Sequence, residues 1–296
     1  MSGFLNTVFV GLSNGSVYAM LAVGLVVIYR ASGLLNFAQG EMAMFATYFV
    51  WMFHDAGLPL PIAALLAMVA GFALGAVTYQ LLVRPVGNVA KDQPLATVIV
   101  TIGMFLAFGA LASLLWGADN LELPKFIEGG TSLFDPPLAW QKILALALLA
   151  IESLALYLLF TRTKLGLAMR AVASNAESAA LCGINVSKVL MLTWGIAASI
   201  GVVAGVIWTQ NVALSVTPAL MGHVLIFAFA AITLGGFDSI VGAVVGGLLI
   251  GLVTELAPKY VEAFSGIPLG AALVVVLIVL MVRPQGLFGS KKVSRV

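Results

Sequence analysis

Residues 162–188 read RTKLGLAMRAVASNAESAALCGINVSK and interrupt a chain that is otherwise almost continuously apolar. Within this hydrophilic loop, Ser174 and Glu177 have the spacing of a capping box, in which a hydroxyl and a carboxylate each satisfy a free backbone N–H group at a helix start. The alanines that follow favour a helix, and Gly183 is a natural stop at its C-terminal end. The loop therefore predicts a short, separately capped helix over residues 174–183.

The composition around this loop places the chain in a lipid bilayer. Of 296 residues, 62% are hydrophobic and 9% are charged, whereas soluble domains carry about 25% charged residues. The single cysteine, Cys182, excludes an internal disulfide and a cysteine-rich metal site. The formal net charge of +2 gives no reason to expect a nucleic-acid partner. The first residues lack the basic region of a cleavable signal peptide, so we expect the first helix to be retained.

The apolar segments predict an all-α polytopic membrane protein with about eight to ten helices, because runs of roughly 20 apolar residues can span a bilayer. The turns at 29–34 and 235–239 are very short, so either is a candidate for a broken or re-entrant helix. We treat residues 1–290 as one transmembrane domain and residues 291–296 as a basic cytoplasmic tail. The nine apolar segments lie at residues 5–29, 34–53, 61–83, 95–117, 142–161, 189–210, 216–234, 240–257 and 268–282.

The charges in the loops predict the orientation, because Lys and Arg in short loops gather on the cytoplasmic side. Loops 84–94 and 162–188 and the C-terminal tail are basic, whereas loop 118–141 is mostly acidic. We therefore expect the N-terminus outside and the C-terminus inside. The basic residues are Arg84, Lys91, Arg162, Lys164, Arg170, Lys188, Arg283, Lys291, Lys292 and Arg295, and the acidic ones are Asp119, Glu122, Glu128 and Asp135.

Glycine-bearing breaks interrupt the apolar pattern in each half of the chain, over residues 36–41 and 235–239. Both are expected near the cytoplasmic face. Paired interruptions of this kind point to repeated halves around a central pathway. An internal repeat is therefore a hypothesis for this chain.

The breaks and the loop resemble motifs of one known family, the permease subunits of bacterial ABC importers for branched-chain amino acids. LNFAQGE, residues 35–41, is similar to the N-F-A-H-G-E signature of that family, with Gln39 in place of the usual histidine. Residues 165–185 resemble its cytoplasmic ATPase-docking loop, and residues 234–247 resemble its late glycine-rich run without the third glycine. The closing RPQGLFG, residues 283–289, is similar to its R-P-x-G-L-F-G tail.

The resemblance implies a multi-pass subunit of the bacterial inner membrane that works within a heteromeric importer. The implied partners are two ATP-binding subunits, a second permease chain that is related or identical, and a periplasmic solute-binding protein that delivers a small molecule. The cargo stays open between branched-chain or other small amino acids and urea or amides. This chain lacks a G-x-x-x-x-G-K-[ST] phosphate loop, so ATP is expected on the partner subunits, with no cofactor or metal on this chain.

The hydrophilic loop contains a predicted helix cap, a group of alanines and a glycine stop, and a loop that only sets the membrane topology does not require these features. We therefore favour a helix that docks on an ATPase over an ordinary basic loop. The residues expected to take part are Arg170, Ser174, Glu177, Ala179, Ala180 and Gly183.

Polar residues within the apolar segments are the candidates for a transport pathway or gate. A charge in hydrocarbon costs roughly 2.5 kcal/mol or more, so Glu41 should face protein or water. It either bonds to a group such as Arg30 or lines the inner gate, and both interpretations stay open. Glu152 is interpreted first as an interhelical contact and second as a contact for a cargo ammonium group, whereas Asp238 is interpreted first as part of a helix cap. The candidates are Asn36, Gln39, Glu41, Thr101, Glu152 and Asp238.

Two other classes of function compete with the importer. A secondary transporter driven by an ion gradient would use carboxylates such as Glu41 and Glu152, but it does not explain the docking loop. A membrane-embedded enzyme is disfavoured, because two histidines and one cysteine offer little for metal or nucleophilic catalysis, and we assign no catalytic residue. Dependence of transport on ATP and on a binding protein separates the first two classes.

Overall fold

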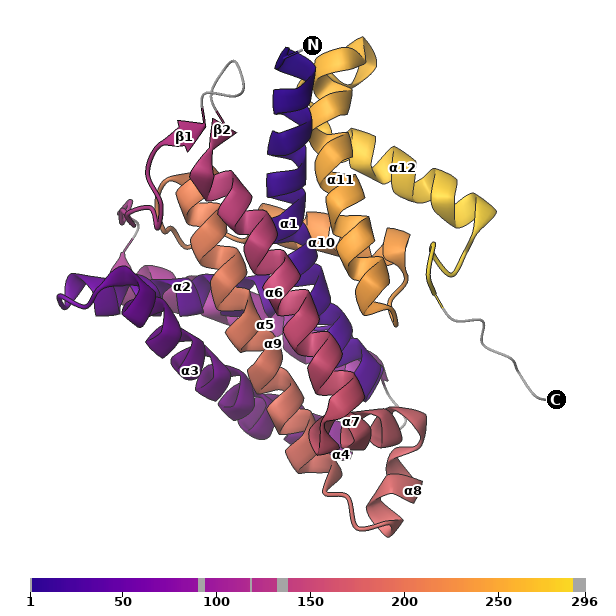
Figure 1. Ribbon diagram of the computed structural model, residues 1–296. Coiled ribbons are helices and arrows are strands. Elements are labelled where there is room, and N and C mark those ends of the chain that lie inside the picture. Colours follow the sequence, from indigo (N-terminus) through magenta and orange to yellow (C-terminus); the bar gives the residue numbers. More distant parts are fainter. Residues whose placement is uncertain (1, 90–93, 118, 132–137, 290–296) are drawn as a thin grey trace.

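The computed structural model describes residues 2–89, 94–117, 119–131 and 138–289. Within this part of the chain nearly all regular structure is helical, and a short antiparallel hairpin precedes α6 (Figure 1). The elements are α1 (Ser2–Ser32), α2 (Gln39–Asp55), α3 (Leu60–Thr78), α4 (Arg84–Val89), α5 (Pro94–Trp116), β1 (Gly130–Thr131), β2 (Leu138–Ala139), α6 (Trp140–Arg162), α7 (Lys164–Ser174), α8 (Ala176–Leu181), α9 (Val186–Trp208), α10 (Gly222–Gly235), α11 (Ile240–Tyr260) and α12 (Pro268–Val282). Single π-helical turns, Tyr79–Val83 and Thr209–Ala213, continue α3 and α9, and a 3-10 turn, Glu262–Phe264, precedes α12.

Each predicted apolar segment contains a helix, and the all-α polytopic fold is confirmed. Six helices of the described residues are long and apolar enough to cross a membrane. By contrast, α2, α10 and α12 are shorter than the roughly 20 residues that a full crossing requires. Two of these short helices adjoin the expected breaks. α2 begins within the first break, at residues 36–41, and α10 ends where the second break, at residues 235–239, begins.

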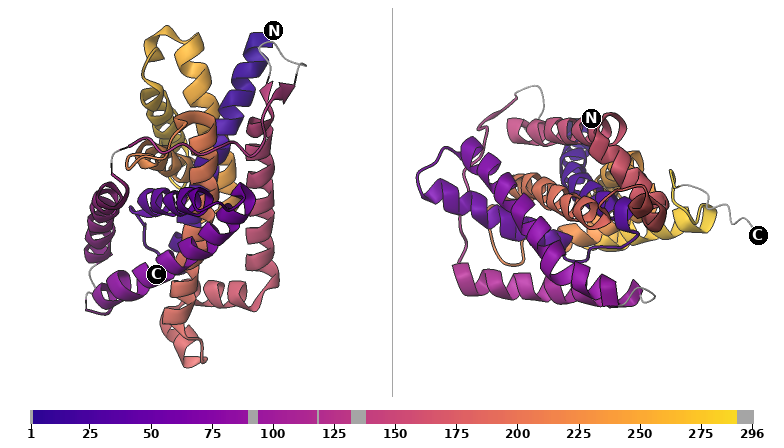
Figure 2. Two further views of the ribbon diagram at one scale, coloured as in Figure 1. Left: turned by 90° about the vertical axis from the view of Figure 1, so that its left-hand side faces the viewer. Right: turned by 90° about the horizontal axis from the view of Figure 1, so that it is seen from below.

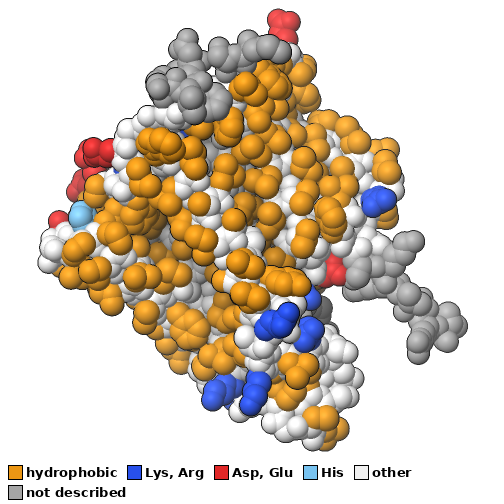
Figure 3. All heavy atoms as spheres, viewed as in Figure 1, with side chains coloured by type: hydrophobic (Ala, Val, Ile, Leu, Met, Phe, Trp, Pro, Cys, Tyr) orange, Lys and Arg blue, Asp and Glu red, His pale blue; other side chains and the backbone are white. Residues whose placement is uncertain are grey.

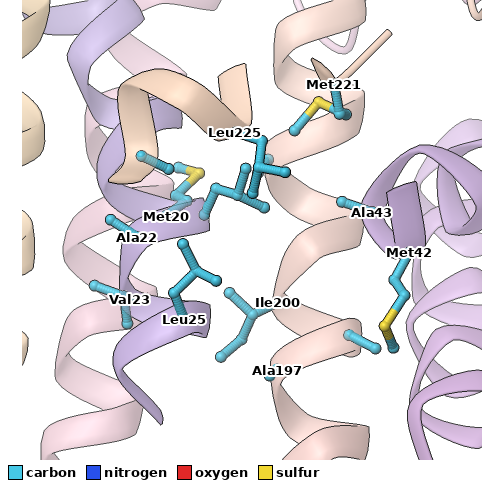
Figure 4. Packing of buried hydrophobic residues seen from close by; sticks show 14 of the residues in the cluster. Met20, Ala22, Val23, Leu25, Met42, Ala43, Ala197, Ile200, Met221 and Leu225 are labelled. Atoms are coloured by element: carbon cyan, nitrogen blue, oxygen red, sulfur yellow. The ribbon is translucent and has the colours of Figure 1, made fainter. Parts of the chain in front are cut away.

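Helix α1 runs through the centre of the bundle. Its sequence is apolar on every face rather than along one stripe, which is typical of a helix surrounded by protein. It packs along α11 and α9 and also contacts α10 and α6. Figure 4 shows side chains of these segments packed together, among them Leu25 of α1, Ile200 of α9 and Leu225 of α10.

The two largest helix–helix contacts each join one helix of the first half of the chain to one helix of the second half. α1 of the first half packs along α11 of the second, and α9 of the second packs along α3 of the first. α1 and α9 run in opposite directions through the bundle (Figure 1), and each is followed by a break and then by a short helix, α2 or α10. This is the arrangement expected of an inverted repeat, in which the sites for cargo lie where the two halves meet.

The longest helix–helix seam, between α1 and α11, depends on glycines. A Cβ atom added at Gly251 would lie 2.3 Å from the Gly11 carbonyl oxygen and 2.3 Å from the Gly15 Cα. One added at Gly247 would lie 2.5 Å from the Ala19 Cα. The two backbones are therefore in direct contact, as the small residues at these positions predict for helices in a membrane.

The loops lie at opposite ends of the bundle in the pattern that their charges predict. The β1–β2 hairpin is at the end of the N-terminus, and α7 and α8 are at the other end (Figures 1 and 2). Figure 3 shows Lys and Arg gathered around α7 and α8, with hydrophobic side chains over the middle of the molecule. Which end faces the cytoplasm stays a prediction. Lys91, Asp135 and the tail 291–296 with Lys291, Lys292 and Arg295 lie outside the described residues.

Candidate functional site

The hydrophilic loop folds into two helices, and the predicted capping box is wrong. Ser174 is the last residue of α7, and the N-cap of α8 is the next residue, Asn175, whose side-chain oxygen accepts the Ser178 N–H at 2.8 Å. Asn175 has the extended backbone (φ −160°, ψ 108°) that an N-cap requires. Asparagine and serine are equally good caps, so the backbone of the α7–α8 junction decides between them.

The C-terminal stop of this helix is confirmed. Gly183 has a positive φ of 85°, which glycine adopts at little cost. The Gly183 N–H donates to the Ala180 carbonyl and the Ile184 N–H to the Ala179 carbonyl, both at 3.0 Å. These two bonds make a Schellman motif. α8 is thus fixed at both ends although it is only 6 residues long.

Two residues of α8 depart from the predicted docking surface. Ala179 was expected on it and is buried, and Leu181 was not expected on it and is exposed. Ala179 is buried, with 5% of its surface exposed, on a helix that packs against α7 and α9. Leu181 is 90% exposed. Glu177 and Ala180 are also exposed. A single exposed leucine is common on protein surfaces, so Leu181 points to a contact only together with the two caps that fix α8.

We expect Asn175→Ala to loosen α8, because loss of an N-cap costs about 1 kcal/mol. If α8 docks on an ATP-binding subunit as the sequence predicts, retention of that subunit by the tagged chain weakens by roughly fivefold to tenfold. Ser174→Ala is the matched control, since its hydroxyl is not the cap, and it should retain the partner as the unmodified chain does. Equal effects of the two substitutions in a quantitative pull-down would contradict the assignment of the cap.

The first glycine-bearing break lies inside the bundle and not near its cytoplasmic face as predicted. The Asn36 side chain accepts the Ala38 N–H at 3.0 Å and donates to Gln39 Oε1 at 3.2 Å. Gln39 Nε2 then donates to the Ala197 carbonyl, halfway along α9, at 2.8 Å. Asn36 and Gln39 are both fully buried. These bonds satisfy the polar groups of the break, so α2 can begin in the interior of an apolar bundle.

Glu41, in the first turn of α2, is not part of this network. It is 3% exposed, and its Oε2 atom has no hydrogen-bond partner among the described residues. It lines a cavity of about 490 Å³ between α2, α5 and the start of α10. The predicted bond to Arg30 is not formed, because Arg30 lies over the Phe160 ring at 5.1 Å in a different cavity.

The other pathway candidates are dispersed. Thr101 is buried and donates to the Val98 carbonyl of its own helix at 2.9 Å. Ser239 caps α11 by accepting the Gly242 N–H at 2.9 Å, as predicted for this break. Asp238 lines a separate cavity together with Arg30 and Arg170.

Glu152 lies apart from all of these residues. Both of its carboxylate oxygens are buried without a hydrogen-bond partner among the described residues, so the predicted interhelical contact is not seen there. It lines an apolar cavity of about 410 Å³ between α3, α6 and α9. Glu152 and Glu41 therefore do not form a shared site.

Sequence reasoning missed Leu181 and the residues around Glu41. Leu181 has a signal, since it is the one large apolar side chain between the cap and Gly183. Phe105, Gly109 and Ile226, which line the cavity of Glu41, have none. Their helices are apolar on all faces, and only the packing decides which side chains turn towards Glu41.

Comparison with known proteins gives a match over almost the whole chain. A family model described as "Branched-chain amino acid transport system / permease component" matches residues 7–282. The high-affinity branched-chain amino acid transport system permease protein LivH of Salmonella typhimurium is 30% identical over 99% of this chain and 98% of its own. The corresponding protein BraD of Pseudomonas aeruginosa is 29% identical over 97% and 96%. The ribose import permease protein RbsC of Escherichia coli is 25% identical over 85% and 77%.

Proposed function

This chain belongs to the family of branched-chain amino acid transport system permease components, and we propose that it carries branched-chain amino acids across the bacterial inner membrane. It is the permease subunit of an ABC importer, a transport subunit rather than an enzyme. Its relatives are permeases of import systems, and they do not favour the ion-coupled secondary transporter. The cargo, the membrane and the partners named below belong to the proposal.

The observation that carries the proposal is α8. It is fixed by Asn175 and Gly183, and it projects from the end of the bundle opposite the N-terminus (Figure 1). Its Leu181 side chain is exposed. These features suit insertion into a groove of an ATP-binding subunit. Arg170 lies on α7, not on α8, and lines a cavity together with Asp238.

Nucleotide-driven closure of two ATP-binding subunits would move α8 and, through α7, the ends of α1, α6 and α9 that α7 contacts. The bundle would then open towards a periplasmic binding protein and afterwards towards the cytoplasm. ATP is bound by the partner subunits, and this chain holds no cofactor of its own. A second permease chain, related or identical, completes the pathway, and residues 1–290 act as a single permease domain in it.

A mild-detergent pull-down of the tagged chain from its native membrane tests the proposal. We expect an ATPase with a G-x-x-x-x-G-K-[ST] loop and a second permease chain to be recovered, and uptake by membrane vesicles to require ATP inside together with a binding protein outside. A chain that is recovered alone and still transports in ATP-free vesicles would overturn it.

A further inference from the structure

The cavity that Glu41 lines brings both halves of the chain together at the starts of their short helices, beside a buried carboxylate with an unpartnered oxygen. Its walls are the start of α2, the middle of α5, and the segment that leads into α10. The starts of the two short helices touch, because a Cβ added at Gly40 would lie 3.0 Å from Leu225 Cβ and 3.2 Å from the Met221 carbonyl oxygen. Its volume of about 490 Å³ falls within the range of small-molecule sites.

One wall of this cavity carries a carboxyl group that has no basic partner in the described part of the chain. Glu41 is 3% exposed and Oε2 has no hydrogen-bond partner there. A Cβ added at Gly109 would lie 3.6 Å from that oxygen, so the glycine leaves the space beside the carboxylate open. A buried carboxylate is costly unless a positive donor meets it. The chemistry that it best accommodates is an ammonium group.

Another wall of the cavity is the start of a helix. α10 is 14 residues long, and its first residues, Gly222 and His223, line the same cavity as Glu41. The first N–H groups of a helix have no acceptor within it, and they carry the positive end of the helix dipole. The residue before the helix, Met221, makes no side-chain cap. The Gly222 N–H donates to the Ala219 carbonyl at 3.4 Å, so the N–H groups that follow it, beginning with that of His223, make this wall suited to a carboxylate.

The rest of the lining is apolar and includes Phe105, Leu106, Ala110 and Ile226. A molecule that satisfies all three walls carries an ammonium group and a carboxylate close together, with a short apolar side chain. A free α-amino acid of the branched-chain type has this composition. In transporters with repeated halves, half-helix N-termini near the midplane contact the anionic group of the cargo in this way.

We propose that this cavity is a transit site for zwitterionic amino acids, in which Glu41 binds the α-ammonium group and the first turn of α10 binds the α-carboxylate. The site rests on the function proposed above and makes it more specific. It assigns part of the cargo selection to this chain and not only to the binding protein. Asn36 and Gln39 are positioning residues, because their bonds to Ala38 and Ala197 fix where α2 begins.

Cysteine protection in the assembled transporter tests the site directly. Cys182 is the single native cysteine and is exposed, so Cys182→Ser gives a background without thiols. Gly109→Cys places a thiol beside Glu41, and Gly103→Cys on the same helix is the matched control, because its Cβ would have nothing within 4 Å and it does not line the cavity. Both are treated with a trimethylammonium methanethiosulfonate reagent.

We expect L-leucine at about ten times its dissociation constant to slow modification of the Gly109→Cys thiol about tenfold and to leave the control unaffected. The same concentrations of 4-methylpentanoate, which lacks the ammonium group, and of isopentylamine, which lacks the carboxylate, should give little protection. Adding Glu41→Gln should abolish protection by leucine. If Gly109→Cys prevents assembly, Ala110→Cys, which also lines the cavity, replaces it.

Uptake separates the failure of this site from the failure of the proposed function. Glu41→Gln keeps the size of the side chain and removes its charge, so we expect leucine uptake to fall by about tenfold or more while the transporter still assembles and hydrolyses ATP. ATP-dependent leucine uptake by the unmodified transporter, without leucine protection of the thiol placed at either cavity position, would overturn the site alone. Lack of ATP-dependent uptake in the unmodified transporter would overturn the function.

Discussion

Leu181→Asp is expected to abolish recovery of the ATPase with this chain and to lower ATP-dependent uptake by about a hundredfold or more. Leu181 is 90% exposed at the end of a helix that is fixed at both ends. Burying a leucine side chain in a partner contributes about 1.5–3 kcal/mol. Placing an unpaired aspartate in the same groove adds a desolvation cost, so the total exceeds the roughly 2.7 kcal/mol that corresponds to a hundredfold loss.

Two controls separate docking from folding. Leu181→Met keeps an apolar side chain of similar size and should retain most of the uptake, since such exchanges usually cost less than about 1.5 kcal/mol. The isolated Leu181→Asp chain should unfold at the same temperature as the unmodified chain, because almost the whole side chain is exposed. Recovery of the ATPase with the Asp variant at the unmodified level would show that α8 docks through another surface.

The positions of the helices in the nine apolar segments, and the presence of the short helix α8 in the loop, could be predicted from the sequence. Lipid requires every backbone group to be satisfied within its own helix, so apolar length alone identifies the segments. The stop at Gly183 was predictable because few residues other than glycine adopt a positive φ easily. The cap was missed by one residue. Serine and asparagine are about equally good N-caps, and the end of α7 decides which of them becomes extended.

The candidate site was only partly predictable, because its residues come from segments far apart in the chain. Glu41 was identified, since a carboxylate in an apolar segment is rare and costly. Its surroundings could not be identified. α5 is apolar on every face, so its sequence does not show that Gly109 faces the carboxylate. Asn36 and Gln39 looked like equal candidates for the pathway, but the packing of α2 against α9 turns them into buried structural bonds.

Gly251→Ala is expected to destabilise the chain by about 2–3 kcal/mol, because the added methyl group meets backbone atoms that cannot move independently. The new Cβ would lie 2.3 Å from both the Gly11 carbonyl oxygen and the Gly15 Cα, and 2.4 Å from the Gly15 nitrogen. Separating α1 from α11 would also loosen the most buried helix of the described bundle. The apparent unfolding temperature of the purified chain in mild detergent measures the effect.

The sign of this effect is what makes the experiment decisive. Alanine is the better helix former by about 1 kcal/mol, so a glycine that lies in open space should become more stable on substitution. Gly103→Ala is such a case, since nothing lies within 4 Å of its Cβ position. Opposite shifts of the unfolding temperature for the two variants would show that backbone contact, and not helix propensity, holds α1 against α11. A rise for Gly251→Ala as well would mean that the seam can open without cost.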